Sequence, residues 1–230
     1  QGRSQTGEAF ETDETEEACE ADKTVGRLGA VVESDQEASL TVNSEGAAAP
    51  PAEPRRLSIR LFRQQASEWC FAAVAQAVAM YFDPANEVHQ CQIVGRGFKR
   101  ACCGDRMAPV RSPECNRQGY LHTVLDAMGL LAQPAEGGPN KWIEGPAPFA
   151  LIQREIDAGR PVCVLIRWKN GGGGHFILIE GYSVSPRGVP AVWVRNPLSP
   201  GSSSRHPYDV IASTSDSGGY QDGQGRWSYT

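Results

Sequence analysis

Cys70 is the residue of this chain best placed to act as a nucleophile. It opens the segment Cys70–Phe82, which is almost wholly apolar and rich in alanine. At that length the run is better interpreted as a buried helix than as a strand, and Asp83-Pro84 ends it. A thiol at the start of a buried helix lies at the positive end of its dipole, which favours the reactive thiolate. On Cys70 alone, a small buried core cysteine would be the simpler interpretation.

A nucleophilic thiol needs a base, and His175 is the best candidate among the four histidines. It follows the glycine run at residues 171–174 and begins the apolar run at 176–179. Glycines let backbone and substrate approach closely, and the start of a strand holds the ring on a rigid element. A histidine at a strand edge is the alternative. The other histidines are expected at the surface: His89, His122 and His206.

Two amide side chains could complete the site. Asn196 ends an apolar segment, and adjacent antiparallel strands would bring it beside His175, where its carbonyl would orient the imidazole. An Asn-Pro turn explains Asn196 equally well on local grounds. Gln64 lies six positions before Cys70 and could join the Cys70 backbone N–H in binding an oxyanion. Gln65 is the neighbouring alternative, and a surface glutamine is the simplest interpretation of either.

Helices are predicted in the first part of the chain and strands in the second. The predicted helices cover residues 70–82, 87–95, 121–128 and 148–157. Residues 97–119 are interpreted as a long loop. The predicted strands cover residues 57–62, 161–168, 175–182, 189–195 and 208–212. This order predicts an α+β domain in which a central helix bearing Cys70 packs on a C-terminal, mainly antiparallel sheet.

Residues 1–56 differ in composition from the rest. They contain an acidic run at residues 11–17 and an Ala- and Pro-rich stretch at 47–54. We predict a partly disordered, acidic tail or prosegment here, with two weak strands at 24–32 and 38–42, and a catalytic domain over residues 57–230. The chain begins at Gln1 without a methionine, which fits a removed leader or a truncation.

Charge and composition disfavour several classes of function. The formal net charge is −5, whereas nucleic-acid-binding proteins usually carry an excess of basic residues. No apolar run is long enough to span a membrane. No cofactor or metal is expected. Four of the seven cysteines cluster in the predicted loop without the paired CxxC of a zinc ribbon: Cys91, Cys102, Cys103 and Cys115. The sequence leaves three alternatives for this cluster: disulfides, a metal site or free thiols. Disulfides would indicate an oxidising compartment and thus a secreted or exported protein.

The candidate residues together resemble the papain-like cysteine peptidase clan. The similarity covers about residues 57–198 and follows the clan's order of Gln, Cys, His and Asn or Asp. Residues 69–73, Trp-Cys-Phe-Ala-Ala, are similar to the Trp-Cys-Trp-Ala-Ala helix start of its bacterial branch, which includes plant-pathogen effector proteases and bacteriocin leader peptidases. Residues 158–162 and the cysteine-rich insert also resemble that branch. Phe71 stands where papain has tryptophan, and Asn196 where leader peptidases usually have Asp.

The resemblance implies an endopeptidase acting on peptides or proteins through a thioester. Cys70 would attack the carbonyl as a thiolate paired with His175, Gln64 would stabilise the oxyanion, and Asn196 would orient His175. The N-terminal segment would be a prosegment that covers the cleft. Two alternative functions stay open: an acyltransferase or deamidase that uses the same site, and an inactive papain-like binding module.

Overall fold

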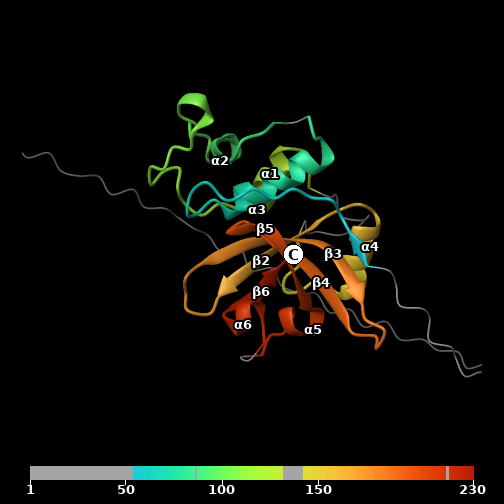
Figure 1. The fold of residues 1–230 in the computed structure, drawn as a ribbon. Helices are drawn as coiled ribbons and strands as arrows, with labels where there is room; N and C mark the ends of the chain where they lie inside the picture. Colours follow the sequence, from blue (N-terminus) through green and yellow to red (C-terminus); the bar gives the residue numbers. More distant parts are fainter. Residues whose placement is uncertain (1–53, 86, 132–141, 216–217) are drawn as a thin grey trace, which may run out of the picture. The chain divides into compact units, whose positions relative to one another are not determined.

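The computed structural model describes residues 54–85, 87–131, 142–215 and 218–230 (Figure 1). The weak strands expected at 24–32 and 38–42 lie outside the described residues. The helices are α1 (Cys70–Phe82), α2 (Gln90–Phe98), α3 (Leu121–Ala127), α4 (Phe149–Asp157), α5 (Tyr208–Ile211) and α6 (Tyr220–Gly223), with a short 3₁₀ turn at Asp105–Met107. The strands are β1 (Arg55–Arg56), β2 (Val162–Trp168), β3 (Gly174–Val184), β4 (Pro190–Asn196), β5 (Ser199–Pro207) and β6 (Gly225–Tyr229). The α+β prediction is confirmed.

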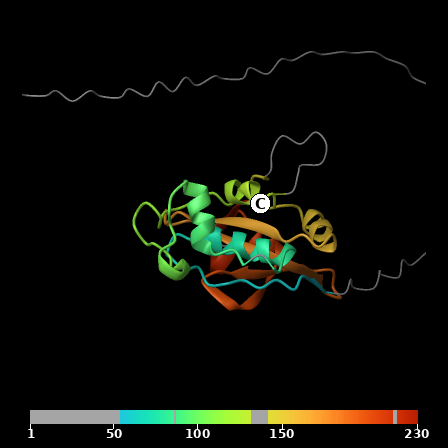
Figure 2. The same cartoon turned by 90° about the horizontal axis from the view of Figure 1, so that it is seen from above.

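The strands form one antiparallel sheet in the order β5-β4-β3-β2-β6, and the short β1 pairs with β3. Apolar side chains on both faces of β2 and β3 create two hydrophobic clusters. Leu178 packs with the cluster of α1, α2 and α3, whereas Ile177 and Ile179 pack with residues of α4, α5 and β6. Figures 1 and 2 show α1–α3 grouped on one side of the sheet.

Helix α1 lies at the centre of the helical part. Its first ten residues, from Cys70 to Ala79, are all buried, as a helix that is apolar all round requires. Five alanines in this stretch leave room for α2, α3 and the sheet to approach closely. The predicted bounds of this helix are confirmed, and the chain leaves it at Asp83 in an extended conformation. Among the described residues, no helix is long and apolar enough to cross a membrane.

Several predicted elements are wrong or displaced. Residues 57–62 form no strand, although their alternation survives as burial: Ile59 and Leu61 are in the core, and Ser58 and Arg60 are exposed. Among the described residues, the segment's one backbone hydrogen bond to the sheet is from the Leu57 N–H to the Glu180 carbonyl, so beyond Leu57 the alternation reports burial and not strand pairing. Helix α2 begins at Gln90 and not at residue 87, and extends into the segment interpreted as loop.

The end of the chain differs most from the prediction. Residues 208–212, expected as a strand, form the short helix α5. The serine-rich segment before it, for which no strand was predicted, is strand β5, and β6 was not predicted either. Strand β5 is at the edge of the sheet and largely exposed, so it carries no apolar alternation to mark it.

A buried charge joins three strands. The Glu180 side chain is fully buried, and the register of β3 and β4 shifts at this residue. Its carboxylate accepts hydrogen bonds from Arg56 of β1 and Arg195 of β4. The Arg56 guanidinium also lies over the Trp193 ring, 4.3 Å from its centroid. These contacts hold β1, and with it the start of the segment that leads to Cys70, against the sheet. The predicted domain boundary between residues 56 and 57 stays a prediction. Strand β1, which lies before this boundary, already pairs with β3 of the sheet.

Candidate active site

Cys70 is the first residue of α1, and its side chain is 8% exposed. The preceding residue, Trp69, is fully buried, and its indole Nε1 donates a hydrogen bond of 2.8 Å to the carbonyl oxygen of Cys115. The first-turn N–H groups of a helix have no acceptors within the helix, so they are available at Cys70. The buried indole therefore fixes the helix start that presents the thiol.

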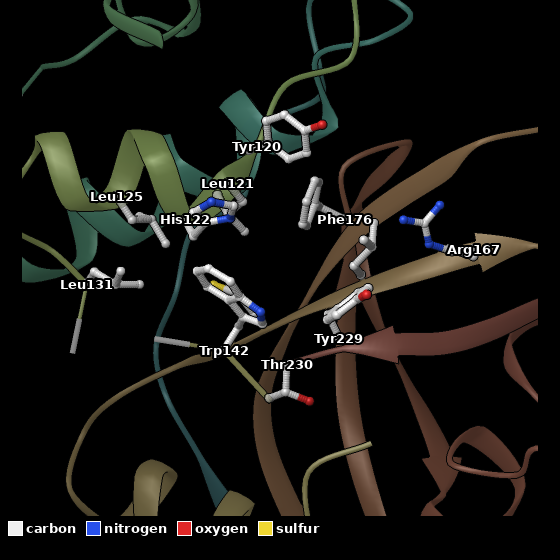
Figure 3. Close-up of a pocket in the computed structure, with 12 residues that line it drawn as sticks. Tyr120, Leu121, His122, Leu125, Leu131, Trp142, Arg167, Phe176, Tyr229 and Thr230 are labelled. Carbon is white, nitrogen blue, oxygen red and sulfur yellow. The ribbon is translucent and has the colours of Figure 1, made fainter. Parts of the chain in front are cut away.

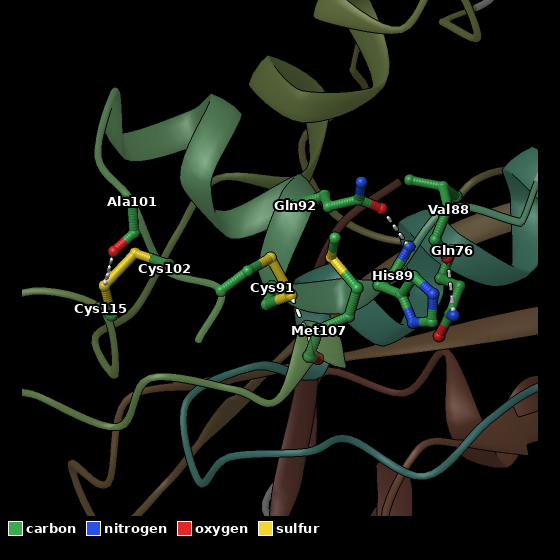
Figure 4. Close-up of a disulfide and its surroundings, with 10 residues drawn as sticks. Gln76, Val88, His89, Cys91, Gln92, Ala101, Cys102, Met107 and Cys115 are labelled. Atoms are coloured by element: carbon green, nitrogen blue, oxygen red, sulfur yellow. Dashed lines mark hydrogen bonds between the residues drawn. A yellow bond between two sulfur atoms is a disulfide. The ribbon is translucent and has the colours of Figure 1, made fainter. Parts of the chain in front are cut away.

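A disulfide-bonded loop supports the turn in front of Cys70. Asn116 accepts the backbone N–H of Glu68 at 3.1 Å and donates to the Ser67 hydroxyl at 3.0 Å. This loop is cross-linked by the Cys102–Cys115 and Cys91–Cys103 disulfides (Figure 4). The disulfide interpretation of the cysteine cluster is thereby confirmed. Among the described residues, no group of His, Cys, Asp and Glu could hold a metal ion.

His175 and Asn196 meet at the opposite side of the site. The His175 Nε2 and the Asn196 Oδ1 are 2.8 Å apart, and His175 is 4% exposed. A side-chain carbonyl oxygen can only accept, so Nε2 carries the proton and Nδ1 is left as the basic nitrogen. Trp168 stacks on the His175 ring, with centroids 6.0 Å apart and planes 21° apart. The Asn196 Nδ2 donates to the buried Tyr220 hydroxyl at 3.0 Å. The arrangement therefore fixes both the tautomer and the orientation of the ring.

Gln64 joins the loop before Cys70 to the turn after Asn196. Its backbone N–H donates to the Pro197 carbonyl at 3.0 Å. Its side-chain nitrogen donates to the carbonyls of Ala66, at 3.0 Å, and Ser67, at 2.7 Å, while its Oε1 is buried without a hydrogen-bond partner. Both amide N–H groups are thus engaged within the loop. Binding an oxyanion with Gln64 requires one of them to change partner.

Gln90 is a supporting residue that the sequence did not reveal. Its side chain is almost fully buried, accepts the Gln65 backbone N–H at 2.9 Å and donates to the Arg63 carbonyl at 2.9 Å. It also donates to Gln76 of α1 at 3.1 Å. Gln90 therefore anchors the backbone on both sides of Gln64. A buried glutamine at the start of a helix has no periodic pattern, and only its position among apolar residues could have marked it.

Cys70 and His175 line one cleft of about 360 Å³, together with Gln64. Asn196 lies behind His175 and does not line it. The other lining residues are Ser67, Glu68, Phe71, Gln118, Gly119, Tyr120, Leu165, Arg167, Trp168, Gly172, Gly174, Phe176 and Leu198. Gly171 and Gly173 have φ of 77° and 82°, so the glycine run turns in a conformation that other residues rarely adopt. The structure thus brings a thiol, an oriented imidazole and an amide side chain to a single open site.

The Peptidase_C39 like family model matches residues 56–227, three quarters of the chain. The chain belongs to this family. Membership makes it a cysteine peptidase of the papain-like clan, which confirms that part of the prediction. No curated protein sequence matches.

Distant structural similarity was found with plant proteases. The bromelain protease from Ananas comosus in complex with the E64 inhibitor has 13% identity and a TM-score of 0.42, over 74% of this chain and 91% of its own. A recombinant stem bromelain precursor has 14% identity and a TM-score of 0.39, over 74% of this chain and 66% of its own. The proform of Amb a 11, a ragweed pollen cysteine protease, has 12% identity and a TM-score of 0.42, over 80% of this chain and 66% of its own.

Burial dominates the electrostatics of this Peptidase_C39-like site. It raises the pKa of the Cys70 thiol above its ordinary 9.0, although backbone amides of Phe176 and Phe71 act in the opposite direction. Burial also lowers the pKa of the His175 ring below its ordinary 6.5, against the effect of the Asn196 hydrogen bond. The helix start supplies the expected amides, but burial outweighs them. Burial therefore favours the neutral form of each group, a protonated thiol and an uncharged ring.

In this family member, an apolar pocket of about 290 Å³ adjoins the cleft that contains Cys70 and His175. Figure 3 shows it between α3, which contributes Leu121 and Leu125, and the sheet, which contributes Phe176 and Tyr229. Trp142 closes one side and contacts His122, with ring centroids 4.7 Å apart and planes tilted by 38°. The pocket also contains the thiol of Cys163, whose pKa burial raises to about 12. Cys163 is therefore protonated and unreactive over the physiological pH range.

Proposed function

We propose that this chain is a cysteine endopeptidase that hydrolyses peptide bonds through a thioester on Cys70. The observation that carries the proposal is the 2.8 Å hydrogen bond between His175 and Asn196 at the cleft that also contains Cys70. A nucleophile, a base and a group that orients the base are the three parts of a Cys-His-Asn triad.

In the proposed reaction, the Cys70 sulfur attacks the substrate carbonyl while its proton passes to Nδ1 of His175. The Cys70 backbone N–H stabilises the oxyanion, joined by a Gln64 N–H released from its loop carbonyl. The leaving amine takes the proton from Nδ1 as the C–N bond breaks, which leaves a thioester. Water then attacks the thioester carbonyl and gives its proton to Nδ1 of His175. The C–S bond breaks, the acid leaves, and the proton returns from His175 to the Cys70 sulfur. Throughout, Asn196 holds the Nε2–H.

The burial of Cys70 and His175 favours direct proton transfer between them. Taking the thiol proton to solvent would leave a buried anion, and protonating the ring from solvent would leave a buried cation. Transfer from Cys70 to His175 creates both charges side by side, where each stabilises the other. The amides of Phe176 and Phe71 favour the sulfur anion once it forms. Proton transfer during attack therefore avoids an isolated buried charge.

The apolar pocket supports recognition of one large apolar side chain. Its wall residue Phe176 also lines the cleft that contains Cys70 and His175, so the pocket opens into that cleft. A volume of about 290 Å³ suits an aliphatic or aromatic side chain. We propose that a peptide substrate places such a residue here, close to the bond that is cleaved.

Iodoacetamide labelling near neutral pH tests the nucleophile. We expect the label on Cys70, and we expect Cys70→Ala to abolish it. Cys163→Ala is the matched control, because its protonated thiol lines the apolar pocket and not the cleft. Cys19→Ser accounts for the cysteine that lies outside the described residues. Labelling that persists in Cys70→Ala at another cysteine would sink the assignment.

Incubation with a peptide library tests the reaction itself. The proposal expects peptide cleavage by the wild-type chain and none by Cys70→Ala. Mass changes without cleavage would instead support transamidation or deamidation at the same site. A Cys70 that neither labels nor turns over any peptide would support an inactive papain-like binding module.

We also propose that residues 1–56 act as a prosegment and that the protein is exported. Their acidic run and proline-rich end precede the catalytic domain, and the two disulfides suit a non-reducing compartment. Deleting residues 1–53 keeps β1 in place and should raise kcat/KM. Unchanged activity and stability after the deletion would make the segment a plain tail.

A further inference from the structure

Arg167 lies where the apolar pocket and the catalytic cleft meet. Four residues line both cavities: Tyr120, Leu165, Arg167 and Phe176. Arg167 is the single charged residue among them. Figure 3 shows its guanidinium on the sheet side of the pocket, opposite the leucines of α3. A substrate side chain that enters the pocket from the cleft must therefore pass Arg167.

The strand pairing keeps this position open. Arg167 is two residues after Leu165 on β2, so both side chains lie on the face of the sheet that α1–α3 cover. Its partner on β3 is Gly174, which has no side chain, whereas the partner of Leu165 is Phe176. On the cleft side, Arg167 therefore has no cross-strand side chain beside it, and a substrate group can take that place.

The charge of Arg167 has no partner within the described part of the chain. Its guanidinium forms no hydrogen bond or ion pair with any described residue, and the side chain is exposed. Glu68 is the one carboxylate among the described residues that line the catalytic cleft, and it does not line the apolar pocket. Arg167 is thus the charged side chain shared by the pocket and the cleft. A guanidinium binds a carboxylate through two parallel hydrogen bonds, which makes a carboxylate its best-matched ligand.

We propose that Arg167 makes this enzyme selective for substrates in which an acidic residue directly precedes or follows the apolar residue held in the pocket. The inference deepens the proposed peptidase function and rests on it. The apolar side chain fills the pocket, and the neighbouring Asp or Glu binds Arg167 at its mouth. Glu68 repels the same acidic residue from the part of the cleft beside Cys70.

Four electrophilic probes that label Cys70 test this without requiring turnover. They are peptidyl acyloxymethyl ketones ending in Leu-Glu, Leu-Gln, Glu-Leu or Gln-Leu, so that Glu and Gln are compared in both orders. We expect Glu to be labelled roughly tenfold faster than Gln in one order. Arg167→Gln should remove this preference, and Arg167→Glu should reverse it. The readout is the second-order rate of mass increase at Cys70.

Arg226→Gln is the matched control. Arg226 pairs with Arg167 across β2 and β6 and carries the same charge, but it lines neither cavity. It should keep the Glu preference of the wild type. Equal Glu and Gln rates in both orders, or a preference that survives Arg167→Gln, would overturn the inference and leave the peptidase intact. No labelling of Cys70 by any probe would contradict the proposed function itself, and this inference with it.

Discussion

Replacing Asn196 by alanine separates the orientation of His175 from the chemistry of Cys70. The substitution removes the acceptor that lies 2.8 Å from His175 Nε2. It also removes a hydrogen bond from the Leu198 N–H, at 2.9 Å, and one to the Tyr220 hydroxyl, at 3.0 Å. The ring itself stays packed, because Trp168 stacks on it and it is almost fully buried.

The expected loss follows from what this hydrogen bond does during the reaction. A hydrogen bond to a neutral group contributes about 0.5 to 1.5 kcal/mol, and one to a charged group about 1.5 to 3 kcal/mol. His175 gains its charge only as Cys70 attacks, so the difference of about 1 to 2 kcal/mol is lost from the transition state. That corresponds to roughly a 5- to 30-fold fall in kcat/KM. The Trp168 stack keeps the loss well below that of Cys70→Ala.

The assay is kcat/KM on a fluorogenic peptide that the wild-type chain cleaves, with circular dichroism to establish folding. Tyr220→Phe is the matched control, because it removes the bond to Asn196 Nδ2, with the Tyr220 hydroxyl's contact to Gln221, and leaves the contact of Asn196 with His175. We expect Tyr220→Phe to lose no more than about threefold. A folded Asn196→Ala protein with wild-type kcat/KM would refute the orienting role.

Three further predictions concern pH, cross-links and the buried charge. Burial lowers the pKa of His175 from 6.5 and raises that of Cys70 from 9.0, so kcat/KM should fall only below pH 6.5 and above pH 9.0. A fall in kcat/KM between pH 6.5 and pH 9.0 would contradict this prediction. Replacing both cysteines of the Cys102–Cys115 disulfide by alanine should lower the free energy of unfolding, measured in urea, by about 3 kcal/mol. It should also lower kcat/KM more than the same change at Cys91–Cys103, because Cys115 accepts the Trp69 hydrogen bond and loss of Cys91–Cys103 should leave the loop before Cys70 in place. Glu180→Ala leaves two arginines without their carboxylate and should cost about 3 to 5 kcal/mol by urea denaturation; a cost below about 1 kcal/mol would show that water replaces it.

The elements that could be predicted are those whose formation depends on local sequence. Helix α1 is apolar on every face, so composition alone gives its burial and both its ends. Strands β2, β3 and β4 carry apolar runs between glycine and proline turns and were predicted to within two residues at each end. Edge strand β5 has no such run, because half of its residues face solvent and its pairing with β4 depends on a partner elsewhere in the chain.

The supports of the site could not be predicted, for a different reason. Gln90, Asn116 and Tyr220 act through side-chain hydrogen bonds to residues far away in sequence. A lone polar side chain has the same local appearance whether it meets water or holds a loop. Only the fold decides which of them becomes buried beside a backbone N–H that needs an acceptor.

Asn196 shows how a local and a functional interpretation can both hold. The β3–β4 register pairs Leu178 with Arg195, which would place His175 opposite Leu198 and not opposite Asn196. The chain turns immediately after Asn196, and its Oδ1 accepts the Leu198 N–H at 2.9 Å, as an asparagine that begins a turn does. The same oxygen lies 2.8 Å from His175 Nε2, and a carbonyl oxygen has two lone pairs for two donors. The turn therefore directs Asn196 diagonally toward the ring, so substitutions that loosen the turn should weaken the orientation of His175 as well.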